Sequence, residues 1–120
     1  MTDLVIFNIL IPLTDDSTGH RHPHTKFSAW ERLSVERFGG LTLTGKGVEG
    51  YWLDPDLPTA SSPVRDLSRA YKIGISPDRV PELRTHLERT AREFGQKCLY
   101  LERAGEAEFV WDPARRIDKG

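Results

Sequence analysis

The most closely spaced side chains with metal-binding chemistry are three histidines at alternate positions, in His20-Arg-His22-Pro-His24. Neutral imidazole binds zinc, copper or nickel, so His20, His22 and His24 form a candidate metal site. A glycine precedes this segment and a proline lies within it, so no helix or strand would hold the imidazoles in a fixed geometry. We therefore predict a solvent-exposed polar loop without metal, and keep metal binding at these histidines as the alternative.

The single cysteine, Cys98, excludes an intrachain disulfide and a cysteine-based zinc cluster. It lies in the apolar run Cys98-Leu-Tyr-Leu101, where a cysteine behaves as a small hydrophobic residue. A catalytic thiolate needs a cationic or basic neighbour, and the local sequence offers none. The sequence also lacks a phosphate loop, a dinucleotide fingerprint, a Gly-x-Ser-x-Gly elbow and a His-Glu-x-x-His motif. We assign no catalytic residue and expect no cofactor.

The composition is that of a globular protein with balanced charge. The 120 residues include 17 Lys and Arg and 18 Asp and Glu, and 38% of them are hydrophobic. A net charge of −1 gives no global attraction to nucleic acid or to an anionic membrane. The apolar start, residues 4–13, is too short to span a bilayer and lacks a basic leader and cleavage site. We expect a cytoplasmic protein that binds neither nucleic acid nor membrane.

Hydrophobic patterning predicts the strands. Residues 4–11 are almost wholly apolar, which indicates a central strand covered on both faces. Residues 41–53 form an irregular strand around Gly45-Lys-Gly47, where a bulge or tight bend is expected. Further strands are expected over residues 67–75 and 97–103, with a short extra strand over residues 106–111.

Two helices separate these strands. Ser28-Ala-Trp-Glu31 matches a capping box and predicts a helix start there, or earlier near Thr25, with an end at the glycines that follow Phe38. Asp78 is the predicted cap of the second helix. The apolar residues of that helix keep a spacing of three or four, which defines one helical face: Val80, Leu83, Leu87, Ala91 and Phe94.

The order strand, helix, strand, strand, helix, strand defines the predicted fold class. Two right-handed crossovers joined by a hairpin give an α+β, ferredoxin-like β-α-β-β-α-β sandwich. Its antiparallel sheet has the order 4-1-3-2, and both helices lie on one face. Residues 1–112 are expected to form the single domain, and residues 113–120 a charged, frayed tail.

Three short segments carry a resemblance: Phe38-Gly-Gly-Leu-Thr42, Gly50-Tyr-Trp52 and the strand that starts at Asp66. They resemble a pattern in small bacterial domains of unknown function, which are similar to the dimeric ferredoxin-like (alpha-beta plait) proteins whose sheets pack face to face. The resemblance spans roughly residues 4–110. It implies the fold, a bacterial origin and a homodimer, and it implies no particular chemistry.

Strand alternation places four polar side chains on the sheet face away from the helices: Asn8, Lys72, Tyr100 and Glu102. Because the first strand lies between the third and fourth in the predicted order, these side chains are expected to converge. Polar groups on an apolar surface are typical of a small-molecule site, so the four are candidate ligand-binding residues. The same surface is equally typical of an oligomer interface, and we favour packing against another sheet.

The preferred functional interpretation is a homo-oligomeric module without enzymatic activity. It would form a homodimer through the open sheet face and bind a small molecule or a partner protein. The alternative is a cofactor-free small enzyme of the dimeric ferredoxin-like type that acts on a small molecule at the same face. In that case Lys72 or Asn8 would polarise the substrate, and Tyr100 or Glu102 would move a proton.

Overall fold

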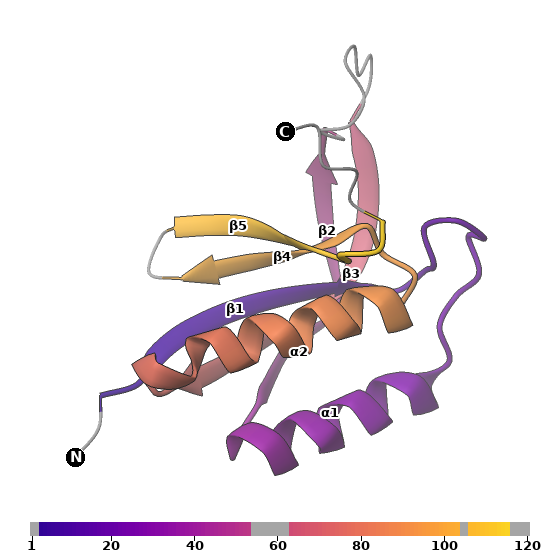
Figure 1. Ribbon diagram of the computed structural model, residues 1–120. Coiled ribbons are helices and arrows are strands. Elements are labelled where there is room, and N and C mark those ends of the chain that lie inside the picture. The colour runs from indigo at the N-terminus through magenta and orange to yellow at the C-terminus, as the bar shows by residue number, and fades with distance from the viewer. Residues whose placement is uncertain (1–2, 54–62, 104–105, 116–120) are drawn as a thin grey trace.

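The computed structural model describes residues 3–53, 63–103 and 106–115 (Figure 1). Their backbone forms an α+β fold, as the sequence predicts. A 3₁₀ turn, Pro77–Arg79, precedes the second helix. The strands and helices are, in chain order, β1 (Val5–Pro12), α1 (His24–Phe38), β2 (Thr42–Trp52), β3 (Val64–Ile75), α2 (Val80–Glu93), β4 (Cys98–Arg103) and β5 (Glu106–Trp111).

The sheet has the strand order β2-β3-β1-β4-β5, and each neighbouring pair is antiparallel. The sheet therefore has five strands, one more than the four of the predicted order 4-1-3-2. The fifth is the short extra strand predicted over residues 106–111, and it pairs along β4, from Glu106 opposite Arg103 to Trp111 opposite Cys98. β1 is central, between β3 and β4.

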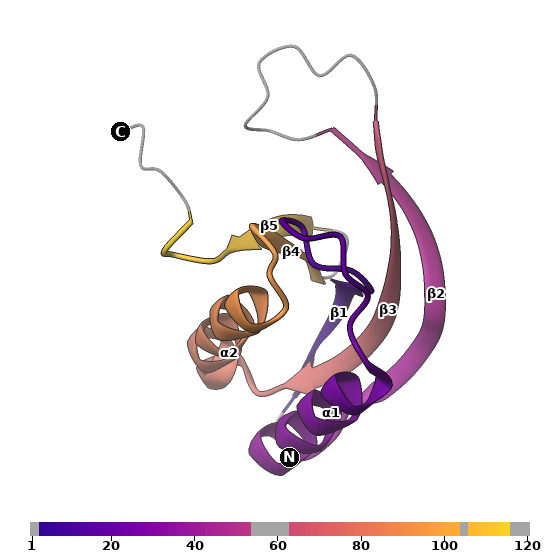
Figure 2. The same ribbon diagram turned by 90° about the vertical axis from the view of Figure 1, so that its right-hand side faces the viewer.

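Both helices cover the same face of the sheet (Figures 1 and 2). The β1 side chains on that face, Phe7, Ile9 and Ile11, are at most 1% exposed. On the opposite face Ile6 is 46% exposed, and Asn8 and Leu10 are half-buried. The prediction that β1 is covered on both faces is therefore wrong for the single chain, because two helices lie on one side only.

Neither predicted cap residue caps its helix, although α1 begins next to the alternative start predicted near Thr25. α1 starts at His24, so Ser28 lies inside the helix and its hydroxyl contacts the His24 ring at 3.2 Å. Glu31 turns to the sheet, where it accepts from Tyr71, and this removes the partner that a capping box needs. Asp78 belongs to the 3₁₀ turn, and α2 begins with no side-chain cap.

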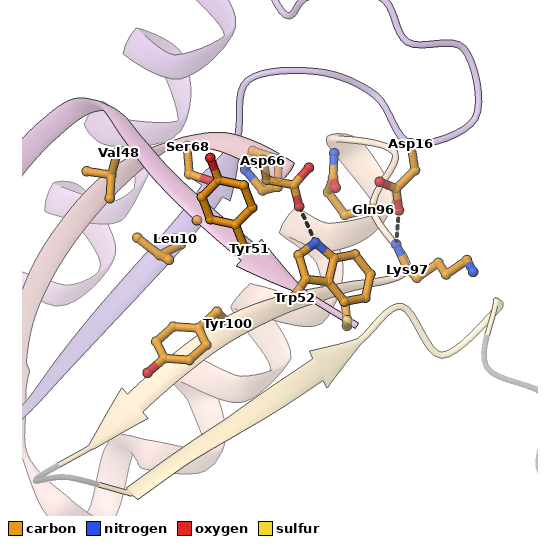
Figure 3. A pocket seen from close by; sticks show the side chains of 13 residues that line it. Leu10, Asp16, Val48, Tyr51, Trp52, Asp66, Ser68, Gln96, Lys97 and Tyr100 are labelled. Atoms are coloured by element: carbon orange, nitrogen blue, oxygen red, sulfur yellow. Dashed lines mark hydrogen bonds between the residues drawn. The ribbon is translucent and has the colours of Figure 1, made fainter. Parts of the chain in front are cut away.

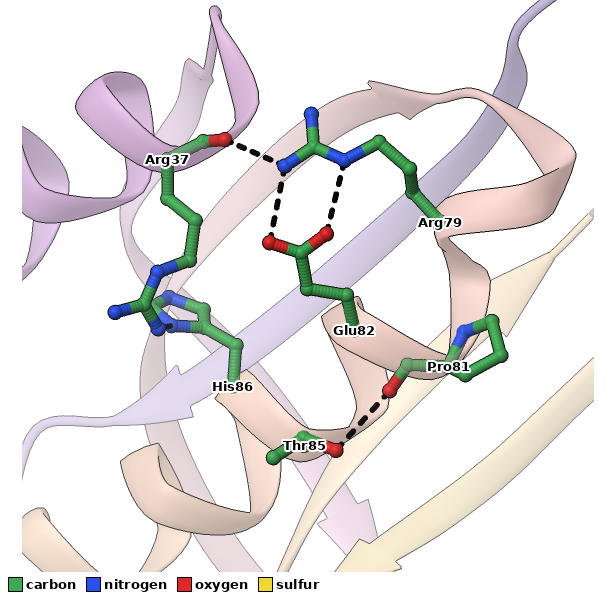
Figure 4. A network of polar contacts seen from close by, with 6 residues as sticks. All are labelled: Arg37, Arg79, Pro81, Glu82, Thr85 and His86. Atoms are coloured by element: carbon green, nitrogen blue, oxygen red, sulfur yellow. Dashed lines mark hydrogen bonds and ion pairs between the residues drawn. The ribbon is translucent and has the colours of Figure 1, made fainter.

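A cationic side chain binds the carboxyl end of each helix. Arg79 donates to the Arg37 carbonyl at the end of α1 (2.7 Å) and also forms a bidentate pair with Glu82 (Figure 4). Lys26, in the first turn of α1, donates to the Glu93 carbonyl at the end of α2. Positive charge at a helix C-terminus offsets the partial negative charge of the helix dipole there. The end of α1 is thus connected to the 3₁₀ turn before α2, and the end of α2 is connected to the first turn of α1.

His86 is buried between the helices and is held as a neutral imidazole. Its ring stacks on Trp30, with centroids 5.7 Å apart, and lies 3.0 Å from the Ser34 hydroxyl at Nε2. Arg37 approaches Nδ1 at 3.1 Å (Figure 4). Because a guanidinium can only donate, Nδ1 accepts and the proton is on Nε2, which donates to Ser34. Burial, followed by the charges of Arg37 and Arg89, lowers the pKa of His86 from 6.5 to about 4.

A second buried imidazole belongs to the segment before α1, which is docked rather than solvated. The His22 Nε2 lies 2.8 Å from the Phe94 carbonyl at the end of α2, and the ring is 9% exposed. Gln96 donates from its side chain to the Thr14 carbonyl (2.6 Å), and Asp16 donates from its backbone to Gly95 (3.0 Å). The predicted polar loop is thus bound to the α2–β4 junction and is not a solvated loop. Its hydrogen-bond partners lie some eighty residues further along the chain.

Gly95 is the contact point of this docked segment. Its φ of +62° lies in the left-handed region, and a Cβ there would come within 1.9 Å of Asp15 Oδ2. The Asp15 carboxylate is fixed because it accepts from Ser17 and from the Thr18 amide. Those hydrogen bonds lower the pKa of Asp15 to about 2. The chain therefore requires glycine at position 95 for both backbone and side-chain reasons.

No helix in the described part of the chain is long and apolar enough to cross a membrane.

The state of His86 predicts a pH dependence of stability. Its folded pKa, about 4, lies below the ordinary 6.5, so the unfolded chain takes up the proton first. The contribution is complete above pH 6.5 and is lost as the pH falls toward 4, by at most about 1.4 kcal/mol per pH unit. Urea unfolding across this range measures it. His86→Gln, which does not titrate, should give a shallower slope, and parallel slopes would contradict the assignment.

The conformation and surroundings of Gly95 predict that its substitution lowers the stability of the fold. Gly95→Ala should lower the unfolding free energy by about 1–2 kcal/mol for the left-handed backbone, and further for the displaced Asp15. Gly19→Ala is the matched control, because Gly19 has a φ of +73° and nothing lies within 4 Å of the position that its Cβ would take. Thermal unfolding of both variants compares the two. Adding Asp15→Ala to Gly95→Ala should recover part of the loss, and equal effects of the two glycine changes would refute the contact.

Candidate functional site

A pocket of about 360 Å³ opens on the sheet face opposite the helices (Figure 3). The ends of β1 and β4 form its floor, the β2–β3 hairpin forms one wall, and the docked segment before α1 contributes at the rim. Its lining combines apolar, aromatic and acidic side chains: Leu10, Pro12, Asp16, Val48, Gly50, Tyr51, Trp52, Asp66, Ser68, Gln96, Lys97, Cys98 and Tyr100.

Strand register brings the wall and the floor together. On β3, Ser68 lies opposite both Pro12 of β1 and Val48 of β2, and Asp66 lies opposite Gly50. The β2–β3 register shifts twice between Leu43 and Val48, and such bulges bend a strand and increase its twist. Figure 2 shows β2 and β3 curving along their length. The β2–β3 hairpin thus bends at the bulge, and the bent part forms one wall of the pocket.

The polar groups of the wall come from one face of β3. Asp66 Oδ2 accepts from the Trp52 indole N–H at 2.5 Å, which fixes both the carboxylate and the ring (Figure 3). Ser68, two residues along, is 4% exposed and lines the pocket. Within the described residues its hydroxyl makes no hydrogen bond, and no buried polar side-chain atom lacks a partner, so this oxygen faces the pocket space. The wall offers one fixed carboxylate and one hydroxyl to a ligand.

The docked segment fixes the far rim. Asp16 Oδ2 accepts from the Lys97 backbone N–H at 3.1 Å. Gln96, 2% exposed, donates its amide to the Thr14 and Phe94 carbonyls. These side chains hold the rim in place before any ligand arrives, because their own hydrogen bonds are already made within the chain.

The four predicted ligand-binding residues lie together, mostly beside the pocket and not in it. Asn8 pairs with Lys72 on one side and Glu102 on the other. Asn8 Nδ2 donates to Glu102 Oε1 (3.0 Å), and the Tyr100 hydroxyl contacts Glu102 Oε2 (3.3 Å). Lys72 is exposed, and Tyr100 is the member that lines the pocket. Burial and the Glu102 charge raise the pKa of Tyr100, which keeps its phenol protonated.

Sequence patterning missed Asp66, Ser68 and Trp52 as a group. Alternation places the start of the third strand at Leu67 and the resemblance places it at Asp66, whereas β3 begins at Val64, and neither gave Asp66 a place in a site. A usable signal is present, because neither glycine nor proline interrupts the chain from Val64 to Ile73. A strand extended back to Val64 has Asp66 and Ser68 on one face.

Two serine–histidine pairs have the distance of a catalytic dyad, but in both the imidazole proton is on the nitrogen that faces the serine. Ser34 pairs with His86, and Ser28 with His24 at 3.2 Å. In a hydrolase an acceptor binds the N–H at Nδ1, so that Nε2 can take the serine proton. Here Arg69 approaches Nδ1 of His24 at 2.9 Å, as Arg37 does at His86, so each Nε2 already carries a proton. Neither histidine is placed to activate its serine.

The three histidines of the candidate metal site have separate surroundings. His20 is exposed, His22 is buried against Phe94, and His24 is the first residue of α1 and contacts Arg69. Over residues 3–53, 63–103 and 106–115, no three His, Cys, Asp or Glu side chains are grouped to hold a metal ion. The geometry therefore gives the metal alternative no support.

No family model matches the chain, and no curated protein matches it. Among solved structures the fold is similar to a phage SAM lyase in complex with S-methyl-5'-thioadenosine, with a TM-score of 0.65. The similarity covers 92% of each chain at 8% sequence identity, so it establishes a shared fold.

Proposed function

We propose that this protein is a small-molecule-binding module and that the open-face pocket is its ligand site. The observation that carries this proposal is the pocket itself, in which a fixed carboxylate and a serine hydroxyl stand among apolar and aromatic walls. Ligand pockets combine such walls with a few positioned polar groups, and about 360 Å³ is within their size range. The ligand would contact Trp52, Asp66 and Ser68, with Asn8, Lys72 and Glu102 beyond the Tyr100 edge.

The similar fold supports the same proposal. The phage SAM lyase holds a thioadenosine, a compact molecule with an aromatic base and a sugar. An indole supplies a stacking surface for such a base, and a carboxylate accepts from hydroxyl or amino groups. A nucleoside-like molecule is therefore the first class of ligand to test.

The first test is calorimetric titration with S-methyl-5'-thioadenosine and with SAM. Because stacking of a base on an aromatic ring is worth about 1–3 kcal/mol, Trp52→Ala should weaken binding by about fivefold or more. Arg65→Ala is the matched control, since Arg65 lies on the same hairpin outside the pocket lining and pairs with Glu49. Circular dichroism checks that both variants fold. Absence of binding by the wild type, or equal losses in both variants, would overturn this assignment of the site.

The second candidate function is a cofactor-free enzyme acting on a small molecule in the same pocket. The structural neighbour is a lyase, and this favours the enzyme as the second candidate. Tyr100 would then hold the proton to be donated, because its raised pKa keeps the phenol protonated at neutral pH. Mass spectrometry of the SAM titration samples separates the candidates: intact SAM supports the binding module, and conversion of SAM supports the enzyme.

We also propose that two copies pair through the open face of a ferredoxin-like sheet. Leu4 and Ile6 are 58% and 46% exposed there, and such a patch commonly marks an interaction site. β5 lies beside β4 as an edge strand of the sheet and does not cross this patch. Paired sheets would leave the pocket between them, so binding and dimerisation are compatible.

Sedimentation equilibrium tests the pairing. Ile6→Arg should shift the protein toward the monomer, because it places a charge in the apolar interface. Val35→Arg is the control, since Val35 is 44% exposed on α1, on the helical side. A wild-type monomer at micromolar concentration, or equal effects of the two substitutions, would contradict the dimer. Ligand binding is a separate measurement, because Ile6 does not line the pocket.

A further inference from the structure

The charges around the pocket carry an inference that rests on the proposed function and narrows its ligand. Two of the lining residues, Asp16 and Asp66, are carboxylates, and one, Lys97, carries an ammonium group. Figure 3 shows the Lys97 side chain running away from Trp52 and Asp66, while its backbone N–H faces Asp16. The inner part of the pocket therefore presents negative charge to a ligand.

Asp66 is the stronger of the two determinants. Its Oδ2 is taken by the Trp52 N–H, and among the described residues no donor binds its Oδ1. A carboxylate only accepts, so a ligand group that meets Asp66 must donate. The bond to the indole N–H also increases the electron density of the ring, which favours a cation or a polarised N–H over the ring face.

Ser68 gives independent support that the wall is made for a polar ligand. Ser68 is only 4% exposed, and its hydroxyl, which makes no hydrogen bond within the described part of the chain, faces the pocket space. A ligand that covers this hydroxyl must bond to it, because burial of a hydroxyl without a partner costs free energy. Asp66 and Ser68 point from alternate positions of β3 to the same side, so one ligand can meet both.

We propose that this pocket selects ligands that donate hydrogen bonds and carry no net negative charge, and that Asp66 is the specificity-determining residue. Amines and unphosphorylated hydroxylated heterocycles belong to this class. Counterparts with a net negative charge, such as phosphate esters and carboxylates without a cationic group, are rejected, because the apolar walls strengthen their repulsion by Asp66.

The test uses two matched pairs of probes that differ in charge: adenosine with adenosine 5'-monophosphate, and tryptamine with indole-3-acetate. Chemical-shift titration should give the uncharged or cationic member about tenfold tighter binding in each pair. Asp66→Asn removes the charge, keeps the volume and retains an acceptor for Trp52, so the ratio should fall toward one. Asp78→Asn is the control, since Asp78 lies outside the pocket lining, and it should leave the ratio unchanged.

The comparison of ratios separates charge from size, because a purely steric rejection of phosphate would survive the isosteric substitution. A wild-type ratio near one, or a ratio that Asp66→Asn does not change, overturns the charge selectivity while the binding function stands. If the wild type binds none of the four probes, the proposed function fails and the selectivity fails with it.

Discussion

The structure depends on the two-sided apolar character of its central strand. Phe7, Ile9 and Ile11 of β1 are packed under the helices, while Ile6 and Leu10 lie on the other face. Two helices cover one face, so the fold leaves apolar surface on the other. The bent hairpin encloses part of that surface as a pocket, and the remainder stays available for association. The packed core, the pocket and the exposed apolar surface are thus consequences of the same strand.

The position of α1 is set by polar contacts rather than by a cap. Glu31 Oε2 accepts from Arg69 at 3.0 Å and from Tyr71 at 2.7 Å. Arg69 also lies over the Phe27 ring, 4.5 Å from its centroid. Burial raises the pKa of Tyr71, so its hydroxyl remains a donor to Glu31. A buried arginine is stable only when its charge is paired, and this pairing fixes α1 over β3.

Periodicity predicted the kinds of element and their order, because alternating and helical patterns report which side chains meet the core. It failed at boundaries and contacts that depend on distant residues. The histidine segment has the composition of a solvated loop, yet its partners are Phe94 and Gln96. Asp66 was not identified as a site residue because its place in the pocket wall depends on the pairing of β3 with β2, which a local pattern does not contain. The proximity of Asn8 and Glu102 could be predicted, since it follows from strand alternation and strand adjacency alone.

The irregularity of β2 has a consequence for how copies of this chain can meet. β2 is an edge strand, and a regular edge offers a row of unpaired amides and carbonyls on which another chain can add a strand. The register shifts around Gly45 interrupt that row, and the Val48 side chain packs close to Gly45, 2.7 Å from where a Cβ of residue 45 would lie. The bulge that builds the pocket wall thereby also discourages edge-to-edge polymerisation along β2.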